Sequence, residues 1–283
     1  MIWLVLAACK GTDVDDTGET GVTEDCAVEM AGSGLPVGPA DCADGVCEVP
    51  AGPFWQGAPS PARPAECPAR QVTLSAFAID QDEVTVGRWQ ACVDAGSCAA
   101  LPETCYFGFE GPLDGLPAVC VTWTQAADFC AWAGGRLPTE AEWEKAARGT
   151  EGAAFPWGSR VPLCADANYR TAVAYCAYSV IDVGSFPDSV TAYGLRDTVG
   201  NAWEWVADHW DAGYYRDAPD ADPPGPAEGC RETVDDAPGE CVFRGMRGGA
   251  YNTTVENVKG AGRSFNSPET WDVNLGLRCA YDR

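Results

Sequence analysis

The residues of this 283-residue chain best suited to do chemistry are its 15 cysteines. Cysteines in such number act either as metal ligands or as disulfide partners. Zinc and iron–sulfur sites are built from CxxC pairs, with histidine nearby in many zinc sites, but no CxxC occurs here and the one histidine is His209. The pattern therefore predicts disulfides, and disulfides predict an oxidising, extracytoplasmic compartment.

His209 also limits the catalytic possibilities. A serine hydrolase would need His209 as its general base, and nothing in the sequence marks a partnered serine. A site built from several histidines cannot be formed from one. We therefore expect His209 to be a surface or packing residue and not a ligand.

The charge of the chain excludes some partners. Forty-two acidic residues against 18 basic ones give a net charge of −24. Such a charge repels phosphate backbones and anionic lipid surfaces, so we expect no nucleic-acid partner. The general interpretation of the excess acid is a solubilising surface.

The first nine residues resemble a bacterial lipoprotein signal. The apolar run 1–6 is too short to span a bilayer, which takes about 20 residues. It ends in Leu-Ala-Ala-Cys9, which resembles a lipobox, although no Lys or Arg precedes it. We predict that Cys9 is lipidated and holds the protein on the bacterial cell envelope, with this lipid as its only membrane contact. The alternative is a buried N-terminal strand.

Two segments follow the signal. Residues 10–25 combine acidic residues, Thr and Gly with isolated valines, a composition that cannot bury enough apolar surface to fold. We expect them to be a disordered acidic tether. Residues 26–42 form a short cysteine-containing lead-in to the main domain.

The main domain opens with a strand and three helices. Residues 71–80 alternate like one strand. A helix begins after Thr85 and ends at Gly96, and a second covers residues 124–132. A third is marked by a capping box, in which Thr139 is followed three residues later by Glu142. Turns, short strands and many glycines fill the rest, which predicts an α+β fold with much irregular backbone.

Several sequence strings in residues 43–283 are similar to the signature of the formylglycine-generating (sulfatase-modifying factor) enzyme family. The most specific is RLPTEAEWE. The strings lie in the family's order, at residues 136–144 (RLPTEAEWE), 155–158 (FPWG), 200–205 (GNAWEW), 247–249 (RGG) and 274–280 (NLGLRCA). The resemblance implies the family's fold, a variant of the C-type lectin fold.

The resemblance also indicates what chemistry is missing. In the family's oxidases, two cysteines after the RGG string bind copper(I) and activate oxygen toward a substrate cysteine. Their approximate positions hold Thr253 and Val255 here, and no cysteine lies between Cys241 and Cys279. We therefore expect no copper and no catalytic residue. The family's iron-dependent branch needs several histidines, which His209 cannot supply.

A calcium site of the family aligns with residues that suit the ion. Its ligands would be the carboxylates of Asp197 and Glu204 and the backbone carbonyls of Gly200 and Ala202. Calcium prefers such oxygen donors. The alternative is that Asp197 caps a turn and Glu204 pairs with an arginine. A second family site would begin at Asn168, and its other ligands are left open.

The disulfides are predicted in part. By resemblance, Cys130 joins Cys279. We add three pairings between cysteines close in sequence, Cys92–Cys98, Cys164–Cys176 and Cys230–Cys241.

Three functions remain in competition. The first is a calcium-stabilised, non-catalytic module that binds a protein, peptide or glycan, either in a cleft near Trp203 and Asn274 or on the loop 211–240, which is rich in Asp, Pro and Gly. The second is an oxidase that converts a substrate cysteine to formylglycine in a rearranged site. The third is a structural envelope protein.

Overall fold

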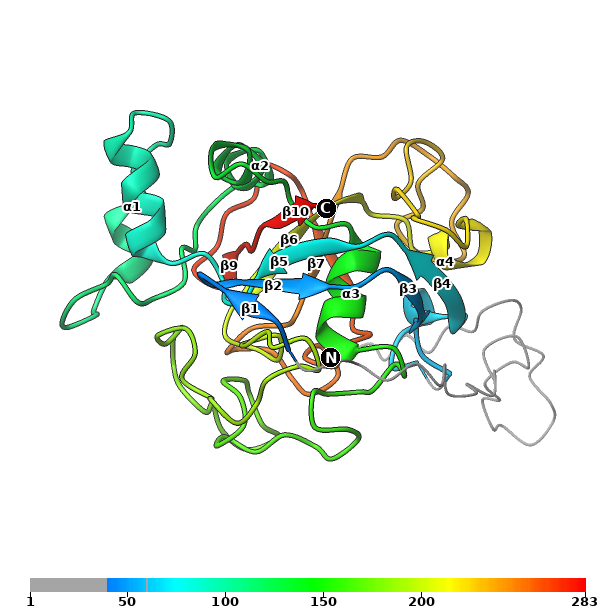
Figure 1. Cartoon of the computed structure of the whole chain (residues 1–283), viewed down its shortest axis with the longest axis horizontal. Coiled ribbons are helices and arrows are strands. Elements are labelled where there is room, and N and C mark those ends of the chain that lie inside the picture. Colours follow the sequence, from blue (N-terminus) through cyan, green and yellow to red (C-terminus); the bar gives the residue numbers. More distant parts are fainter. Residues whose placement is uncertain (1–39, 60) are drawn as a thin grey trace.

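The computed structural model describes residues 40–59 and 61–283 (Figure 1). The predicted lipidation residue Cys9, the tether 10–25 and nearly all of the lead-in 26–42 lie outside these residues. Within the described part of the chain, no helix is both long enough and apolar enough to span a membrane.

Short strands form three sheets in the described residues. The first is antiparallel, with strand order β1-β2-β5-β10, and it joins the start of the domain to the last strand of the chain. The second is the hairpin β3-β4, and the third has the order β8-β7-β6-β9 with β6 and β9 parallel. The strands are β1 (Cys42–Ala43), β2 (Val46–Val49), β3 (Gly52–Gln56), β4 (Arg70–Leu74), β5 (Phe77–Asp80), β6 (Trp203–His209), β7 (Arg244–Arg247), β8 (Ser264–Asn266), β9 (Leu275–Gly276) and β10 (Ala280–Asp282).

The helices begin where their capping residues predict. Thr85 caps α1, and Thr139 caps α3 through the predicted capping box with Glu142. The helix predicted at 124–132 is also present but starts one residue earlier, because Thr122 caps it in a second capping box with Gln125. The helices are α1 (Val86–Asp94), α2 (Trp123–Trp132), α3 (Glu140–Arg148), α4 (Tyr214–Asp217) and the 3₁₀ turns η1 (Pro64–Glu66) and η2 (Glu103–Tyr106).

The single strand expected over residues 71–80 is wrong. The chain breaks at Ser75 and Ala76, and the two halves enter different sheets: β4 pairs with β3, whereas β5 lies between β2 and β10. Across the break the large apolar residues change from even positions, Val72 and Leu74, to odd positions, Phe77 and Ile79, and the interpretation as one strand overlooked this shift.

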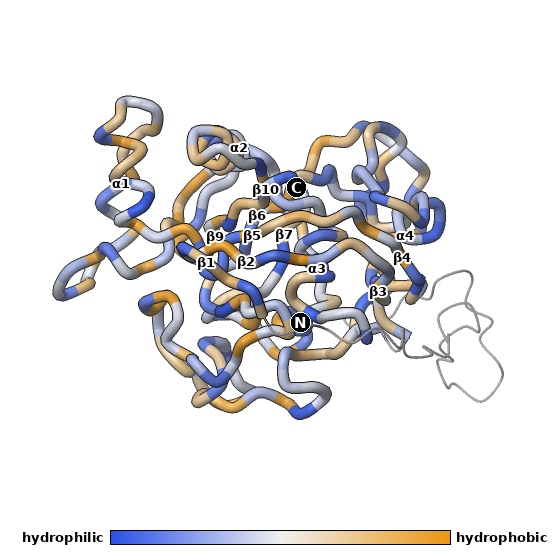
Figure 2. Tube along the Cα trace, viewed as in Figure 1, coloured by the Kyte–Doolittle hydropathy of each residue, from blue (hydrophilic) through white to orange (hydrophobic). Residues whose placement is uncertain are grey.

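The main core lies between helices α1 and α2 and the third sheet. Trp89 of α1 stacks on Phe129 of α2, with ring centroids 5.1 Å apart. Figure 2 shows hydrophobic and hydrophilic residues alternating along α1, whose buried face carries Trp89 and Cys92. In Figure 1, α1 lies at one end of the molecule, and the loops around α4 lie at the opposite end. The fold is α+β, as predicted.

All four predicted disulfides are present. They join Cys130 to Cys279, Cys92 to Cys98, Cys164 to Cys176 and Cys230 to Cys241. Two further bonds, Cys42–Cys47 and Cys105–Cys120, were not predicted, and Cys67 is also disulfide-bonded. No cysteine among the described residues is free.

Removing the Cys130–Cys279 bond with the double substitution C130A/C279A should destabilise the protein most among the disulfides. The bond closes a loop of 149 residues inside the core, and a long loop loses more chain entropy on closure than a short one. We expect the free energy of unfolding, measured in urea, to fall by about 2–5 kcal/mol. The control C164A/C176A opens a separation of only 12 residues and should cost less. Equal losses would contradict the prediction.

Candidate functional site

The loop that would carry the copper ligands contains no thiol. Thr253 stands at one position, and its hydroxyl donates to the carbonyl of Ala250 and accepts from the Ala250 amide, both at 2.9 Å. Val255 stands at the other and packs, half-buried, against the cluster that contains Phe155 and Tyr169. Both side chains are therefore used to hold the loop, and neither can coordinate copper(I).

The segment expected to bind calcium is a tight turn that leads into β6. Asp197, Gly200 and Asn201 have positive φ angles of 58°, 85° and 61°. A side chain at Gly200 would collide with the carbonyl oxygen of Asn168, because an ideal Cβ there lies 2.1 Å from it. The Asp197 carboxylate is buried, accepts a hydrogen bond from the Gly184 amide at 2.5 Å and has a pKa raised to about 6 by burial.

Asn168, the start of the second family calcium site, has its side-chain amide fully occupied. Its Nδ2 donates to the carbonyl of Ser179 and to Oδ1 of Asn201, and its Oδ1 accepts from the Ala177 amide. The residue therefore acts as a connector between loops here.

Glu204 is already paired with an arginine. Its carboxylate accepts from Arg278 at 2.6 and 2.7 Å and from the Trp143 indole at 2.6 Å. Glu204 and Arg278 are both fully buried. The pairing with an arginine, which was the alternative to calcium coordination, is therefore the arrangement that the structure contains for Glu204.

Glu83, three residues after the end of β5, is the acidic residue that the sequence analysis missed. It is 1% exposed, and its carboxylate accepts from the Ala202 amide at 2.9 Å and from the Asn201 side chain at 2.7 Å. Burial, followed by the nearby charges of Asp197 and Glu204, raises the pKa of Glu83 well above its usual value. Glu83 lies just beyond the strand predicted over residues 71–80, and no residue spacing in the sequence connects it to the turn at Gly200.

The arrangement therefore brings together two buried carboxylates, Asp197 and Glu83, around the turn that contains Gly200 and Ala202. No basic side chain forms an ion pair with either of them in the described part of the chain. A hard cation with oxygen ligands fits such a donor set. No group of three or more His, Cys, Asp or Glu side chains is placed to hold a metal within residues 40–59 and 61–283, so backbone carbonyls and water would complete the coordination.

The predicted cleft residues are connected, but one of them is buried. The Trp203 amide donates to the carbonyl of Asn274 at 2.8 Å, and the Asn274 side chain donates to Asn252 at 2.8 Å. The Trp203 indole belongs to the main core and is only 5% exposed. Asn274 is half-buried and held by Asn252, whereas the Trp203 side chain serves packing.

His209, at the end of β6, is half-buried. Its pKa is lowered, first by burial and then by the charge of Arg244. It forms no ion pair with a carboxylate in the described residues.

The comparisons with known proteins match almost the whole chain. The sulfatase-modifying factor enzyme 1-like domain matches residues 36–283. The formylglycine-generating enzyme of Thermomonospora curvata is 29% identical over 303 residues, which cover 86% of this chain and 95% of that protein. The inactive C-alpha-formylglycine-generating enzyme 2 of Bos taurus is 30% identical over 287 residues, covering 82% and 86%. Among solved structures, PvdO from Pseudomonas aeruginosa has a TM-score of 0.67 at 28% identity, covering 84% of this chain and 94% of that one.

The substitution Glu204→Gln separates an ion-pair role from a metal-ligand role. It leaves the Arg278 charge buried without its partner, which costs about 3–5 kcal/mol. We expect that loss in urea unfolding whether calcium or the chelator EGTA is present. Glu48→Gln, which breaks the exposed pair with Arg283, is the control and should cost about 0–1 kcal/mol. A loss that vanishes in EGTA would instead identify Glu204 as a calcium ligand.

Proposed function

We propose that this chain, which belongs to the sulfatase-modifying factor enzyme 1-like family, is a non-catalytic member that binds a ligand outside the cytoplasm. Its fold is the α+β variant of the C-type lectin fold. The ligand class is a protein, peptide or glycan. The family relation alone does not decide between oxidase and binding module, because one fold hosts both.

The observation that carries this proposal is the loop at Thr253 and Val255. Its two positions hold a hydroxyl and a methyl-bearing side chain in place of thiols, and the described cysteines are all committed to disulfides. Copper(I) prefers soft sulfur ligands, and this loop contains no sulfur ligand for it. The relative from Bos taurus that is named inactive supports the same conclusion, since it indicates that the fold occurs without the oxidase activity.

The location follows from the cysteines. Six disulfides lie between described residues, as is typical of proteins from oxidising compartments. Lipid attachment at Cys9 remains a prediction of the sequence and would anchor the domain on the bacterial envelope.

The full-length protein should neither bind copper(I) nor consume oxygen. We would titrate copper(I) under anaerobic conditions and then measure oxygen uptake and aldehyde formation with a cysteine peptide of the sulfatase type. The formylglycine-generating enzyme of Thermomonospora curvata is the positive control. Turnover by this protein above the rate of the copper-free blank would overturn the proposal in favour of an oxidase with a rearranged site.

We further propose that the turn after Asp197 holds calcium, with one change to the predicted ligands. Asp197, Gly200 and Ala202 stay in the set, and Glu83 takes the place of Glu204. Neither carboxylate forms an ion pair within the described residues, and a divalent cation between them would offset their mutual repulsion when both are ionised. The ion would supply structural stability and no chemistry.

Calcium should accordingly stabilise the protein. At a concentration a hundredfold above its dissociation constant, the ion is expected to add about 2.7 kcal/mol to the free energy of unfolding. Asp197→Asn and Glu83→Gln should each remove this response in thermal unfolding, while Glu204→Gln, although less stable, should keep it. A wild-type melting temperature that is the same in calcium and in EGTA would refute the site.

A further inference from the structure

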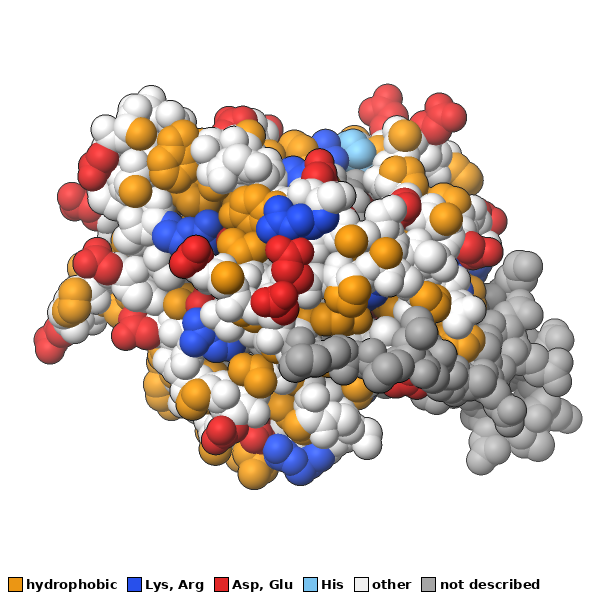
Figure 3. Space-filling model, in the orientation of Figure 1, with side chains coloured by type: hydrophobic (Ala, Val, Ile, Leu, Met, Phe, Trp, Pro, Cys, Tyr) orange, Lys and Arg blue, Asp and Glu red, His pale blue; other side chains and the backbone are white. Residues whose placement is uncertain are grey.

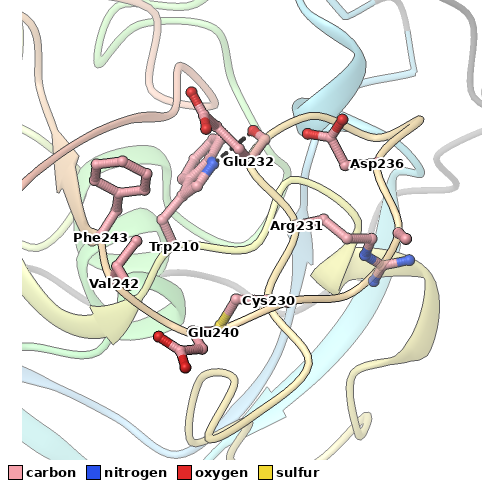
Figure 4. Close-up of a pocket in the computed structure, with 10 residues that line it drawn as sticks. Trp210, Cys230, Arg231, Glu232, Asp236, Glu240, Val242 and Phe243 are labelled. Carbon is pink, nitrogen blue, oxygen red and sulfur yellow. Dashed lines mark hydrogen bonds between the residues drawn. The ribbon is translucent and has the colours of Figure 1, made fainter.

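A pocket of about 360 Å³ opens beside the loop that follows α4, away from the turn at Asp197. One of its lining residues, Cys230 (Figure 4), is joined to Cys241 by a disulfide. Its volume lies within the usual range for sites that take a small molecule or a side chain. The lining residues are Trp210, Cys230, Arg231, Glu232, Asp236, Ala237, Gly239, Glu240, Val242 and Phe243.

Aromatic and aliphatic side chains form the floor of this pocket. Trp210 stacks on Phe265 at 4.8 Å, Phe243 packs on the same ring at 5.0 Å, and the Trp210 indole donates to the carbonyl of Glu232 at 2.9 Å. Val242 adds an aliphatic side chain that is 51% exposed. Figure 4 shows Trp210, Phe243 and Val242 at one end of the pocket.

The rim is acidic. Glu232, Asp236 and Glu240 are all exposed, and none of them forms an ion pair within the described part of the chain. Figure 3 shows acidic side chains at the upper right corner of the molecule, where Figure 1 places the loops around α4. The pocket therefore combines an apolar floor with uncompensated negative charge.

The one basic residue of the pocket is already neutralised. Arg231 donates to the buried Asp211 at 2.8 and 3.0 Å and lies 3.4 Å from Asp217. Its guanidinium also covers Gly213, where an added Cβ would lie 2.2 Å from its Cζ, so the arginine is held in this position. Figure 4 shows the guanidinium turned away from Trp210. Arg231 therefore anchors the loop and does not compete with a cationic ligand.

We propose that this pocket binds a basic side chain, lysine or arginine, of a peptide or protein partner. The aliphatic stem of such a side chain packs on apolar surface while its charged end reaches polar surroundings, which matches the floor and rim described here. The inference deepens the proposed function and rests on it, because it names the ligand class of a binding module.

The test uses the full-length protein and four small probes: the N-acetyl amides of lysine and arginine, and their neutral counterparts norleucine and citrulline. Calorimetry or NMR titration should give binding of the two basic probes that is at least about tenfold tighter than that of the neutral ones, equivalent to 1.4 kcal/mol. The affinity should fall as salt is added, because exposed charges are screened. A tripeptide with a central lysine should bind more tightly than the single lysine probe if the partner is a peptide or protein. Equal affinity of the tripeptide and the single residue would instead indicate a small amine as the ligand.

The double variant E232Q/E240Q should lose about tenfold in affinity for the basic probes. E103Q/D188N removes the same charge from exposed sites outside the pocket and should bind like the wild type. Both variants alter exposed residues, so unchanged urea midpoints would verify their folding. Equal affinity for basic and neutral probes, or full binding by E232Q/E240Q, would overturn the pocket assignment. These binding measurements use no copper and no oxygen. Their failure would therefore contradict the pocket assignment without contradicting the proposal that the protein is non-catalytic.

Discussion

A buried network of ion pairs around α3 holds the parts of this fold together. The Glu140 carboxylate is shared by Arg263 at 2.7 Å and Arg247 at 3.2 Å, and Glu144 pairs with Arg247 at 2.7 Å and with Arg148. Charges removed from water are costly unless each is paired and hydrogen-bonded. The network therefore forces α3, β7 and the segment before β8 into one arrangement, since separating them would leave bare charges in the interior.

The same network explains why family membership says little about chemistry. The carboxylates of Glu140 and Glu144 lie within the string RLPTEAEWE, and their partner Arg247 begins RGG. Glu204 of GNAWEW pairs in the same way with Arg278 of NLGLRCA. Four of the five strings that carry the resemblance thus supply complementary buried charges, and these charges help to specify the fold. The resemblance implies that the oxidase chemistry depends on a few side chains in the loop after RGG, and we propose that this chain departs from the oxidases there, because no cysteine lies between Cys241 and Cys279.

Much of the fold could be predicted because its signals are local. A threonine with a Glu or Gln three residues later marks the starts of α2 and α3 by direct hydrogen bonding, and cysteines 6–12 residues apart pair in closed loops. The site was harder because its contacts are distant in sequence. Glu83 reaches the Ala202 amide across 119 residues, and no spacing rule connects them. Burial is also a property of the whole fold, so the sequence could not reveal that the Trp203 indole faces the core.

The internal pairing also changes how the net charge of −24 acts on partners. Four arginines, at positions 148, 247, 263 and 278, are buried and bound to glutamates, so they do not contribute to the surface field as free cations. The remaining exterior has few basic groups to offset its carboxylates. A field of this sign draws cations toward the surface over about a Debye length, roughly 8 Å at physiological salt. We propose that this field favours cation binding at two specific sites, the pocket beside Glu232 for a basic side chain and the turn at Asp197 for calcium. Chemistry that requires anions would be opposed over the rest of the surface.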